Sequence, residues 1–235
     1  MNHINVLLTT AATVAFIHTF IGIDHYVPFI ALNKANNWAM KKTLLIVTAC
    51  GLAHVLSSVA LGVAGIALSK GLGLMINIEN FRGSIATYFL IAFGLVYTIY
   101  GIRRVVKNKT HSHVDEDGQT IMHVHTKNGK GHDHNIDHSR RHKNLVWGLV
   151  VVFLLGPCEP LIPIVMYPAA AHNTPAIFMV TAVFAVCTIG TMLVMTSLGV
   201  KGISMLRLGK LQRYTHVLAG SAITLCGLLI LVLPI

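Results

Sequence analysis

Long apolar runs separated by polar segments make up most of this chain. Six of them are about 20 residues or longer, the length that a helix needs to cross a hydrocarbon core of about 30 Å. They cover 6–32, 43–68, 84–102, 145–167, 176–200 and 214–234. We predict that each run is helical, because lipid offers the backbone no hydrogen-bond partner. The pattern therefore predicts an all-α, polytopic membrane protein with six transmembrane helices.

One polar segment, 103–143, is far longer than the others and lies between the third and fourth apolar runs. It divides the chain into a three-helix unit at 1–102 and a second one at 144–235, with no length left for a soluble domain. No Lys or Arg precedes the first apolar run, and no small-residue cleavage site follows it. We therefore expect this run to be a spanning helix and not a removable signal peptide.

The composition changes the set of partners that we expect. Hydrophobic residues make up 54% of the chain and charged residues only 11%, whereas soluble domains carry about a quarter charged residues. The net charge is +10, but the basic residues lie between the apolar runs and no nucleic-acid motif accompanies them. We expect the lipid bilayer as a partner and no nucleic acid, and the sequence leaves a homo-oligomer open.

The distribution of Lys and Arg predicts the orientation in the membrane. Sixteen of the eighteen lie in the segments after the first, third and fifth runs, and only Lys70 and Arg82 lie on the other side. Lys and Arg accumulate on the cytoplasmic side of such proteins. We therefore predict a multi-pass protein of an inner, plasma-type membrane, with both termini extracytoplasmic and 103–143 as a cytoplasmic loop.

The two three-helix units resemble each other at a nearly constant offset. The matched positions, 135 to 137 residues apart, are Asp24 and Glu159, Pro28 and Pro163, Cys50 and Cys187, Leu61-Gly62 and Leu198-Gly199, and Gly83-Ser84 and Gly220-Ser221. An odd number of helices in each unit places the two units in opposite orientations. We therefore predict a 3+3 inverted repeat, a transporter architecture in which the substrate site lies near the midplane where broken helices meet.

Two acidic residues, Asp24 and Glu159, are expected well within the spans. A charge at the bilayer centre costs about 3 kcal/mol, so such residues have a function or a polar partner. His25 adjoins Asp24, and His54 lies in the middle of the second run. His18 precedes His25 by seven residues, which places both on one helix face about 10 Å apart. We predict that these residues bind a metal ion, with His18 as a ligand, at an entrance, or orienting a neighbour.

The fourth run contains the sequence Gly-Pro-Cys-Glu-Pro at 156–160. Three prolines within 157–163 do not continue a regular helix, so we predict a break there that frees backbone groups around Cys158. Gly22 and Pro28 predict a similar break in the first run. A thiolate, carboxylates and imidazoles together suit nickel, cobalt or zinc and not magnesium or calcium, which adds Cys158 to the predicted metal ligands.

The predicted loop is rich in histidine. Its candidate metal-capture residues, called the loop histidines below, are His111, His113, His123, His125, His132, His134, His138 and His142. Six of them form three His-x-His pairs, and acidic residues stand among them. We predict that this segment binds soft-to-borderline cations in a pH-dependent manner, because imidazole must be neutral to bind a metal. The alternative is a solvated, disordered linker.

Three helices, a His-rich loop and three further helices resemble the NicO-type nickel/cobalt transporters. The motifs that carry the resemblance are His18 with Asp24-His25, His54, and the sequence at 156–160. The group includes sulfite-exporter/urease-accessory membrane proteins and the DsbD/CcdA thiol electron carriers. Nickel transporters of a related family have one residue fewer between the His and the Asp-His pair. The resemblance implies transport across the cytoplasmic membrane without ATP hydrolysis, and the chain has no phosphate-loop motif.

We therefore expect a secondary transporter of a divalent transition-metal cation, of the nickel/cobalt class or of zinc or iron. It is expected to have neither enzymatic activity nor a prosthetic group. Export is favoured over import, because a cytoplasmic His-rich loop would collect metal for export. Binding of a cation displaces protons from carboxylate and imidazole ligands, so we expect proton coupling.

Three alternatives stay open from the sequence. A thiol–disulfide electron carrier would use Cys158, or the matched pair Cys50 and Cys187. A sulfite-type anion exporter fits poorly with two carboxylates inside the spans. An accessory membrane protein that delivers metal to an enzyme has the same sequence features.

Overall fold

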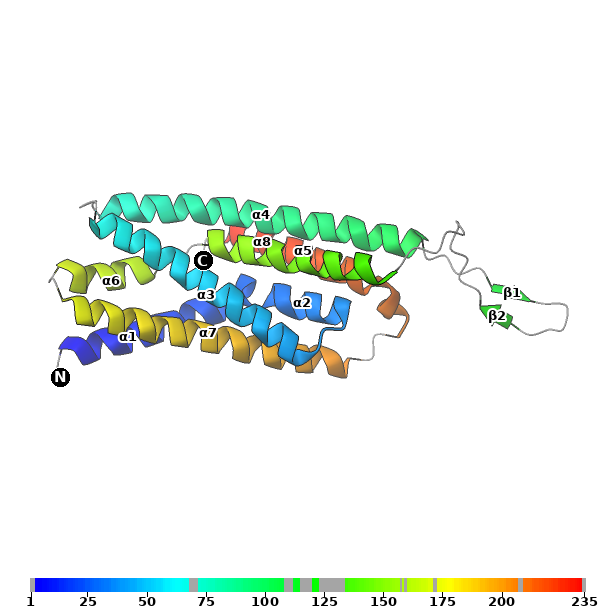
Figure 1. Ribbon diagram of the computed structural model, residues 1–235, viewed down its shortest axis with the longest axis horizontal. Helices are drawn as coiled ribbons and strands as arrows, with labels where there is room; N and C mark the ends of the chain where they lie inside the picture. Colours follow the sequence, from blue (N-terminus) through cyan, green and yellow to red (C-terminus); the bar gives the residue numbers. More distant parts are fainter. Residues whose placement is uncertain are drawn as a thin grey trace.

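The computed structural model of the chain is a bundle of helices (Figure 1). It describes residues 3–67, 72–107, 112–114, 120–122, 134–156, 158, 160–170, 173–206 and 209–233. The elements are α1 (His3–Ile21), the 3-10 helix η1 (Ile23–His25), α2 (Val27–Asn36), α3 (Met40–Ala67), α4 (Leu72–Lys107), β1 (Ser112–Val114), β2 (Thr120–Met122), α5 (His134–Leu155), α6 (Leu161–Ala170), α7 (Thr174–Met205), the 3-10 helix η2 (Gly209–Tyr214) and α8 (Thr215–Val232). Apart from the short antiparallel pair β1–β2, the described elements are helical, which confirms the all-α prediction.

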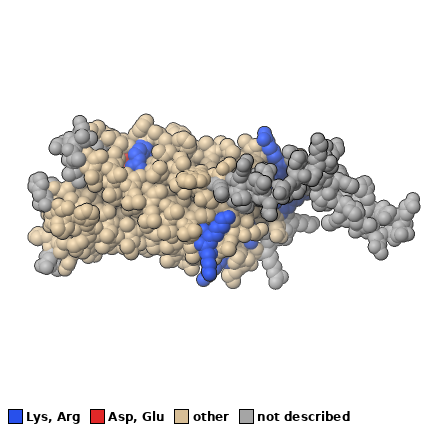
Figure 2. Space-filling model, in the orientation of Figure 1, with Lys and Arg blue, Asp and Glu red and all other residues tan. Residues whose placement is uncertain are grey.

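Five of the described helices are long and apolar enough to cross a membrane: α1, α3, α4, α7 and α8. Large hydrophobic side chains lie on their outer surfaces; Leu45, Phe178 and Val186 are each more than 70% exposed. On the face in Figure 2, uncharged residues cover the broad middle of the bundle, and Lys and Arg gather mostly toward one end. Such an apolar surface suits lipid and not water, so this is a multi-pass membrane protein.

Two predicted spans, 6–32 and 145–167, contain a break in place of one straight helix. Gly22, η1 and Tyr26 separate α1 from α2, and the segment 156–160 separates α5 from α6. In Figure 1, α1 and α6 occupy one end of the bundle and α2 and α5 the other, so both breaks fall toward its middle. The two predicted helix breaks are therefore confirmed. The apolar part of α5, Asn144–Leu155, is too short to cross a membrane alone.

The predicted third span, 84–102, is too short, because α4 covers Leu72–Lys107. Glu79 and Arg82 lower the hydropathy of the segment before residue 84, yet both lie inside the helix. Arg82 Nη1 donates a hydrogen bond to Glu79 Oε2 at 2.7 Å, and Glu79 is 1% exposed. The expectation of only two acids within the spans is wrong, and so is the placing of Arg82 in a loop.

The predicted cytoplasmic loop, 103–143, is shorter at both ends. α4 continues to Lys107 and α5 begins at His134, so the first and last residues of the predicted loop are helical. Lys and Arg next to an apolar run lower its mean hydropathy but not its helix propensity. Hydropathy alone therefore ends the helix before the loop too early and begins the helix after the loop too late. The boundaries at 102 and 144 between loop and helical units therefore move into the loop.

α4 and α8 pack closely along a seam of small residues. A Cβ added at Gly94 on α4 would lie 2.5 Å from Thr224 on α8, and one added at Gly220 on α8 would overlap Thr98 on α4. Each helix thus contributes a glycine and, four residues later, a threonine, and the two helices are antiparallel. Gly220 therefore lies against Thr98 of α4, and the predicted repeat match of Gly220 with Gly83 stays a prediction.

Gly94→Ala is expected to destabilise the fold, because the added methyl group would meet Thr224 and push the seam apart. Overpacking costs about 1–3 kcal/mol, and a protein of this size loses about 2–4 °C of its unfolding midpoint per kcal/mol. The midpoint of the purified protein, measured in detergent by circular dichroism, should fall accordingly. The control is Gly190→Ala on α7, where a Cβ would meet no described atom within 4 Å. This variant should be neutral or slightly stabilised, and equal losses in both variants would contradict the seam.

Candidate metal centre

The break between α1 and α2 depends on Gly22. Its N–H donates to His18 O at 2.9 Å, which closes the last turn of α1 before the chain leaves the helical conformation. A Cβ at Gly22 would lie 2.6 Å from His25 Nδ1, so a side chain there would displace the imidazole. Pro28 lies in the first turn of α2, where a missing N–H is tolerated. The chain therefore turns at Gly22, and the turn brings His25 back toward the end of α1.

Three imidazoles meet at this break and are called the histidine triad below. His18 comes from the last turn of α1, His25 from η1 and His54 from the middle of α3. One ligand atom of each lies within 4.8 Å of the other two. The rings of His18 and His25 are centred 5.0 Å apart, so the spacing of about 10 Å expected for an unbroken helix is wrong. The break brings the two rings together.

The donor set of the triad fits a transition metal. Ligand nitrogens that are about 2.0–2.1 Å from a tetrahedral zinc ion lie about 3.3 Å from one another. The ligand atoms of the triad lie within 4.8 Å of one another, so they would draw closer on binding, and both His25 and His54 are 3% exposed. Among the described residues, no hydrogen-bond partner meets His18 Nε2, His25 Nε2 or either ring nitrogen of His54. Buried imidazole nitrogens need a partner, and a cation that prefers imidazole ligands supplies one.

Asp24 orients one of the three imidazoles. His25 Nδ1 lies 3.1 Å from Asp24 Oδ1 and 3.1 Å from Gly22 O, so this nitrogen carries the proton. Nε2 of the same ring is then the free donor atom for a metal, which is the usual arrangement of carboxylate, histidine and metal. The Asp24 side chain is 38% exposed, so it also places a negative charge at the edge of the buried triad.

The break between α5 and α6 lies against the same site. A Cβ at Gly156 would lie 3.3 Å from His54 Nδ1, so the chain passes directly beside the imidazole. Phe153, one turn earlier on α5, has its ring centre 6.4 Å from that of His25 and 6.2 Å from that of His54. An aromatic wall and the end of α5 therefore enclose the triad and keep it in a medium of low polarity.

The other predicted metal ligands lie outside the histidine triad or outside the described residues. Cys158 is fully buried in an apolar cluster, and its backbone N–H donates to Ser58 Oγ at 3.1 Å. Neither Cys158 nor Asp24 belongs to the group of ligand atoms within 4.8 Å. Glu159 lies outside the described residues, so its predicted part in the site stays a prediction. The sequence left three roles open for His18: a ligand, a residue at an entrance, or one that orients a neighbour. In the structure its ligand atom belongs to the triad.

The loop histidines are described only in part. His111, His123, His125 and His132 lie outside the described residues. His113 lies in β1, and the last three, His134, His138 and His142, lie in the first turns of α5 at intervals of four residues. The predicted capture of metal by this segment stays a prediction.

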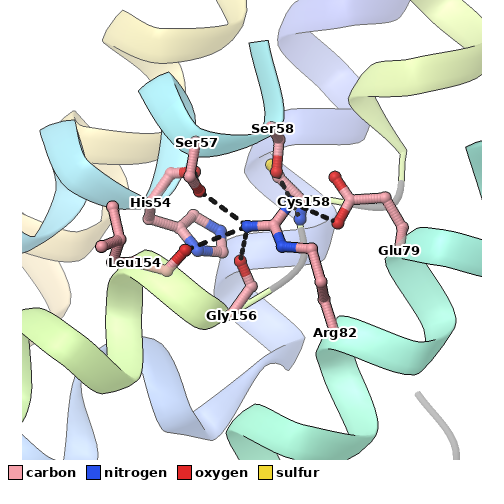
Figure 3. A network of polar contacts seen from close by, with 8 residues as sticks. All are labelled: His54, Ser57, Ser58, Glu79, Arg82, Leu154, Gly156 and Cys158. Carbon is pink, nitrogen blue, oxygen red and sulfur yellow. Dashed lines mark hydrogen bonds and ion pairs between the residues drawn. The ribbon is translucent and has the colours of Figure 1, made fainter. Parts of the chain in front are cut away.

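A polar network around Arg82 was missed by the sequence analysis (Figure 3). Besides its bond to Glu79, the Arg82 guanidinium donates through Nη2 to Ser57 Oγ at 2.8 Å, Leu154 O at 3.0 Å and Gly156 O at 3.4 Å. The signal in the sequence is an acid and an arginine three residues apart between apolar stretches, which is the spacing of an ion pair on one helix face.

A second polar network, also missed, joins α2, α4 and α8. Tyr97 OH lies 2.9 Å from Asn36 Nδ2 and 2.8 Å from His216 Nδ1, and Arg104 Nη1 contacts His216 Nε2. Because Arg only donates, His216 accepts at Nε2 and its proton lies on Nδ1, facing Tyr97. Both ring nitrogens of His216 are hydrogen-bonded to other side chains, so neither is available to bind a metal ion. The signal in the sequence is a single histidine within the apolar run 214–234, which indicates a buried polar contact.

Comparison with known proteins gives no further lead. No family model matches the chain, and neither a curated protein nor a solved structure matches it.

Asp24→Asn is expected to weaken metal binding about 10- to 100-fold, because the His25 imidazole loses the charged partner that orients it. His54→Ala, which removes a ligand, should weaken it further. The measurement is competition for cobalt with a chromophoric chelator, on purified full-length protein whose eight loop histidines are replaced by Asn. His216→Ala is the matched control, since this buried imidazole lies in the other network. Wild-type affinity in Asp24→Asn and His54→Ala together would contradict the site.

Proposed function

We propose that this protein is a secondary transporter of a divalent transition-metal cation of the nickel, cobalt or zinc class, with iron as a further candidate. The observation that carries the proposal is the histidine triad: three imidazoles whose ligand atoms lie within 4.8 Å of one another inside a bundle of membrane-length helices. Neutral imidazole suits these metals and is a poor ligand for magnesium or calcium. Asp24 supplies a negative charge beside the triad, which favours a cation over an anion.

The path of the chain supports six membrane crossings. We infer that α1–α2 and α5–α6 each cross once as a broken helix, and that α3, α4, α7 and α8 cross once each. Each three-helix unit then consists of one broken helix followed by two long ones. The antiparallel, reciprocal contact of Gly94 and Thr98 with Thr224 and Gly220 is what a 3+3 inverted repeat would produce. Paired broken helices near the middle of the bundle are a feature of secondary transporters.

Orientation and direction follow from charge and chemistry. The excess of Lys and Arg after the first, third and fifth predicted spans supports an inner-membrane protein with both termini extracytoplasmic. The loop histidines would then collect metal in the cytoplasm, which favours export. Imidazole binds a metal only without its second proton, so loading the triad would release protons and unloading would take them up. The proposal includes neither an enzymatic step nor a prosthetic group, and the triad is complete within one chain.

Burial of the thiols favours this proposal over a thiol–disulfide carrier. Cys50 and Cys158 are fully buried and Cys226 is 2% exposed, whereas thiol exchange needs an accessible thiolate. None of the four cysteines, all of which the structure describes, forms a disulfide.

Transport can be tested in proteoliposomes with an entrapped cobalt-sensitive dye. The wild-type chain should carry cobalt across the bilayer, and the rate should respond to an imposed pH gradient, because protons and metal compete for the triad. His54→Ala and Asp24→Asn should reduce the flux to the level of empty vesicles. Deletion of 111–142, which removes the loop histidines with the polar first turns of α5, should retain flux and change only its dependence on metal concentration. Full flux in both site variants, or loss of flux on loop deletion alone, would contradict the proposal.

A further inference from the structure

Arg82 lies where three helices meet. It belongs to α4, its hydrogen-bond acceptor Ser57 belongs to α3, and the carbonyls of Leu154 and Gly156 lie in the last turn of α5 and just after it (Figure 3). Glu79, one turn before Arg82 on the same helix, accepts from Nη1 at 2.7 Å and holds the guanidinium in place. The Arg82 side chain is 17% exposed and that of Glu79 1%, so the pair is largely removed from solvent.

The end of α5 needs donors from elsewhere. The last carbonyls of a helix have no partner in their own helix, and in a membrane water cannot supply one. The proline-rich break prevents α6 from continuing the ladder of hydrogen bonds. Arg82 Nη2 meets two of these carbonyls, Leu154 O and Gly156 O. A guanidinium has five donors in a planar fork and reaches several acceptors at once, which the ammonium of lysine cannot do in the same geometry.

The same network leads directly to the metal site. Ser57 Oγ, which accepts from Arg82, donates to His54 O at 2.8 Å. Ser58, the next residue, accepts from the backbone N–H of Cys158 within the break at 3.1 Å. The turn of α3 that follows His54 is therefore tied at two adjacent residues to the broken segment. On the other side of the contact, Gly156 lies against the His54 ring itself.

We propose that Arg82, held by Glu79, is a positioning residue of the metal site: it locks the α5–α6 break against α3 and so fixes the His54 imidazole opposite His18 and His25. This inference rests on the proposed function, because it assumes that the triad binds metal. The helices α1, α3 and α4 then meet the α5–α6 break in one rigid site. Ligand positions within about 0.5 Å decide metal affinity and geometry, so a loosened break should alter both.

The test is cobalt binding to the purified full-length chain with the eight loop histidines replaced by Asn. Visible absorption of Co(II) gives both the dissociation constant and the coordination geometry. The principal variant is the double substitution Glu79→Gln with Arg82→Gln, which removes the lock without leaving one buried charge unpaired. Ser57→Ala removes the acceptor for Arg82 on α3 together with the local hydrogen bond to His54 O, and it is the milder variant. Arg103→Gln, an exposed arginine on the same helix, controls for loss of a positive charge.

We expect the double variant to bind cobalt at least tenfold more weakly and with altered visible bands, Ser57→Ala to bind a few-fold more weakly, and Arg103→Gln to match the wild type. Gly94→Ala, which disturbs the α4–α8 seam, is the control for general destabilisation: its unfolding midpoint should fall while its cobalt affinity and spectrum stay unchanged.

Wild-type affinity and bands in the double variant would overturn the inference, as would an equal loss of affinity in Gly94→Ala. If the double variant does not fold, Ser57→Ala decides: weaker binding supports the inference, and unchanged binding overturns it. Failure of the proposed function itself is distinguishable, because the wild-type chain would then bind no cobalt at all.

Discussion

Lipid supplies no hydrogen bonds, and this constraint governs the structure more than any other. A spanning helix satisfies its own backbone groups, so each place where the helix is broken must be repaired by other parts of the protein. In the part of the chain that the structure describes, such breaks follow Ile21 and Leu155. At the first break, Gly22 O accepts from His25; at the second, Arg82 donates to Gly156 O, and Ser58 Oγ accepts from the N–H of Cys158.

The contacts that satisfy the backbone at the two breaks also position the residues of the candidate site. Folding back at Gly22 brings His25 beside His18, two residues that an unbroken helix would hold far apart. The end of α5 packs against His54, and the aromatic ring of Phe153 closes the apolar side. Two irregular backbone segments and polar side chains from α1, α3 and α4 thus converge on one point. That convergence links fold to function: the same residues that satisfy the breaks orient ligands.

Apolar runs and prolines in the sequence were enough to predict a helical membrane bundle and both helix breaks, because lipid leaves the backbone few options. They did not reveal the close approach of His18 and His25, which depends on backbone angles after Gly22. Hydropathy placed the start of α4 too late, since it counts Glu79 and Arg82 separately and does not register that they neutralise each other. The repeat match of Gly83 with Gly220 stays a prediction, because chance matches between apolar segments are common. The contacts of Gly94 with Thr224 and of Gly220 with Thr98 are visible only in three dimensions.

We propose above that three imidazoles hold one divalent transition metal inside the bundle. X-ray absorption of the zinc-loaded, full-length chain with its loop histidines replaced by Asn tests this most directly. We expect one zinc per chain, with about three imidazole nitrogens at roughly 2.0–2.1 Å and the characteristic outer-shell scattering of the rings. An all-oxygen shell, a shell dominated by sulfur at about 2.3 Å, or no bound zinc would contradict it.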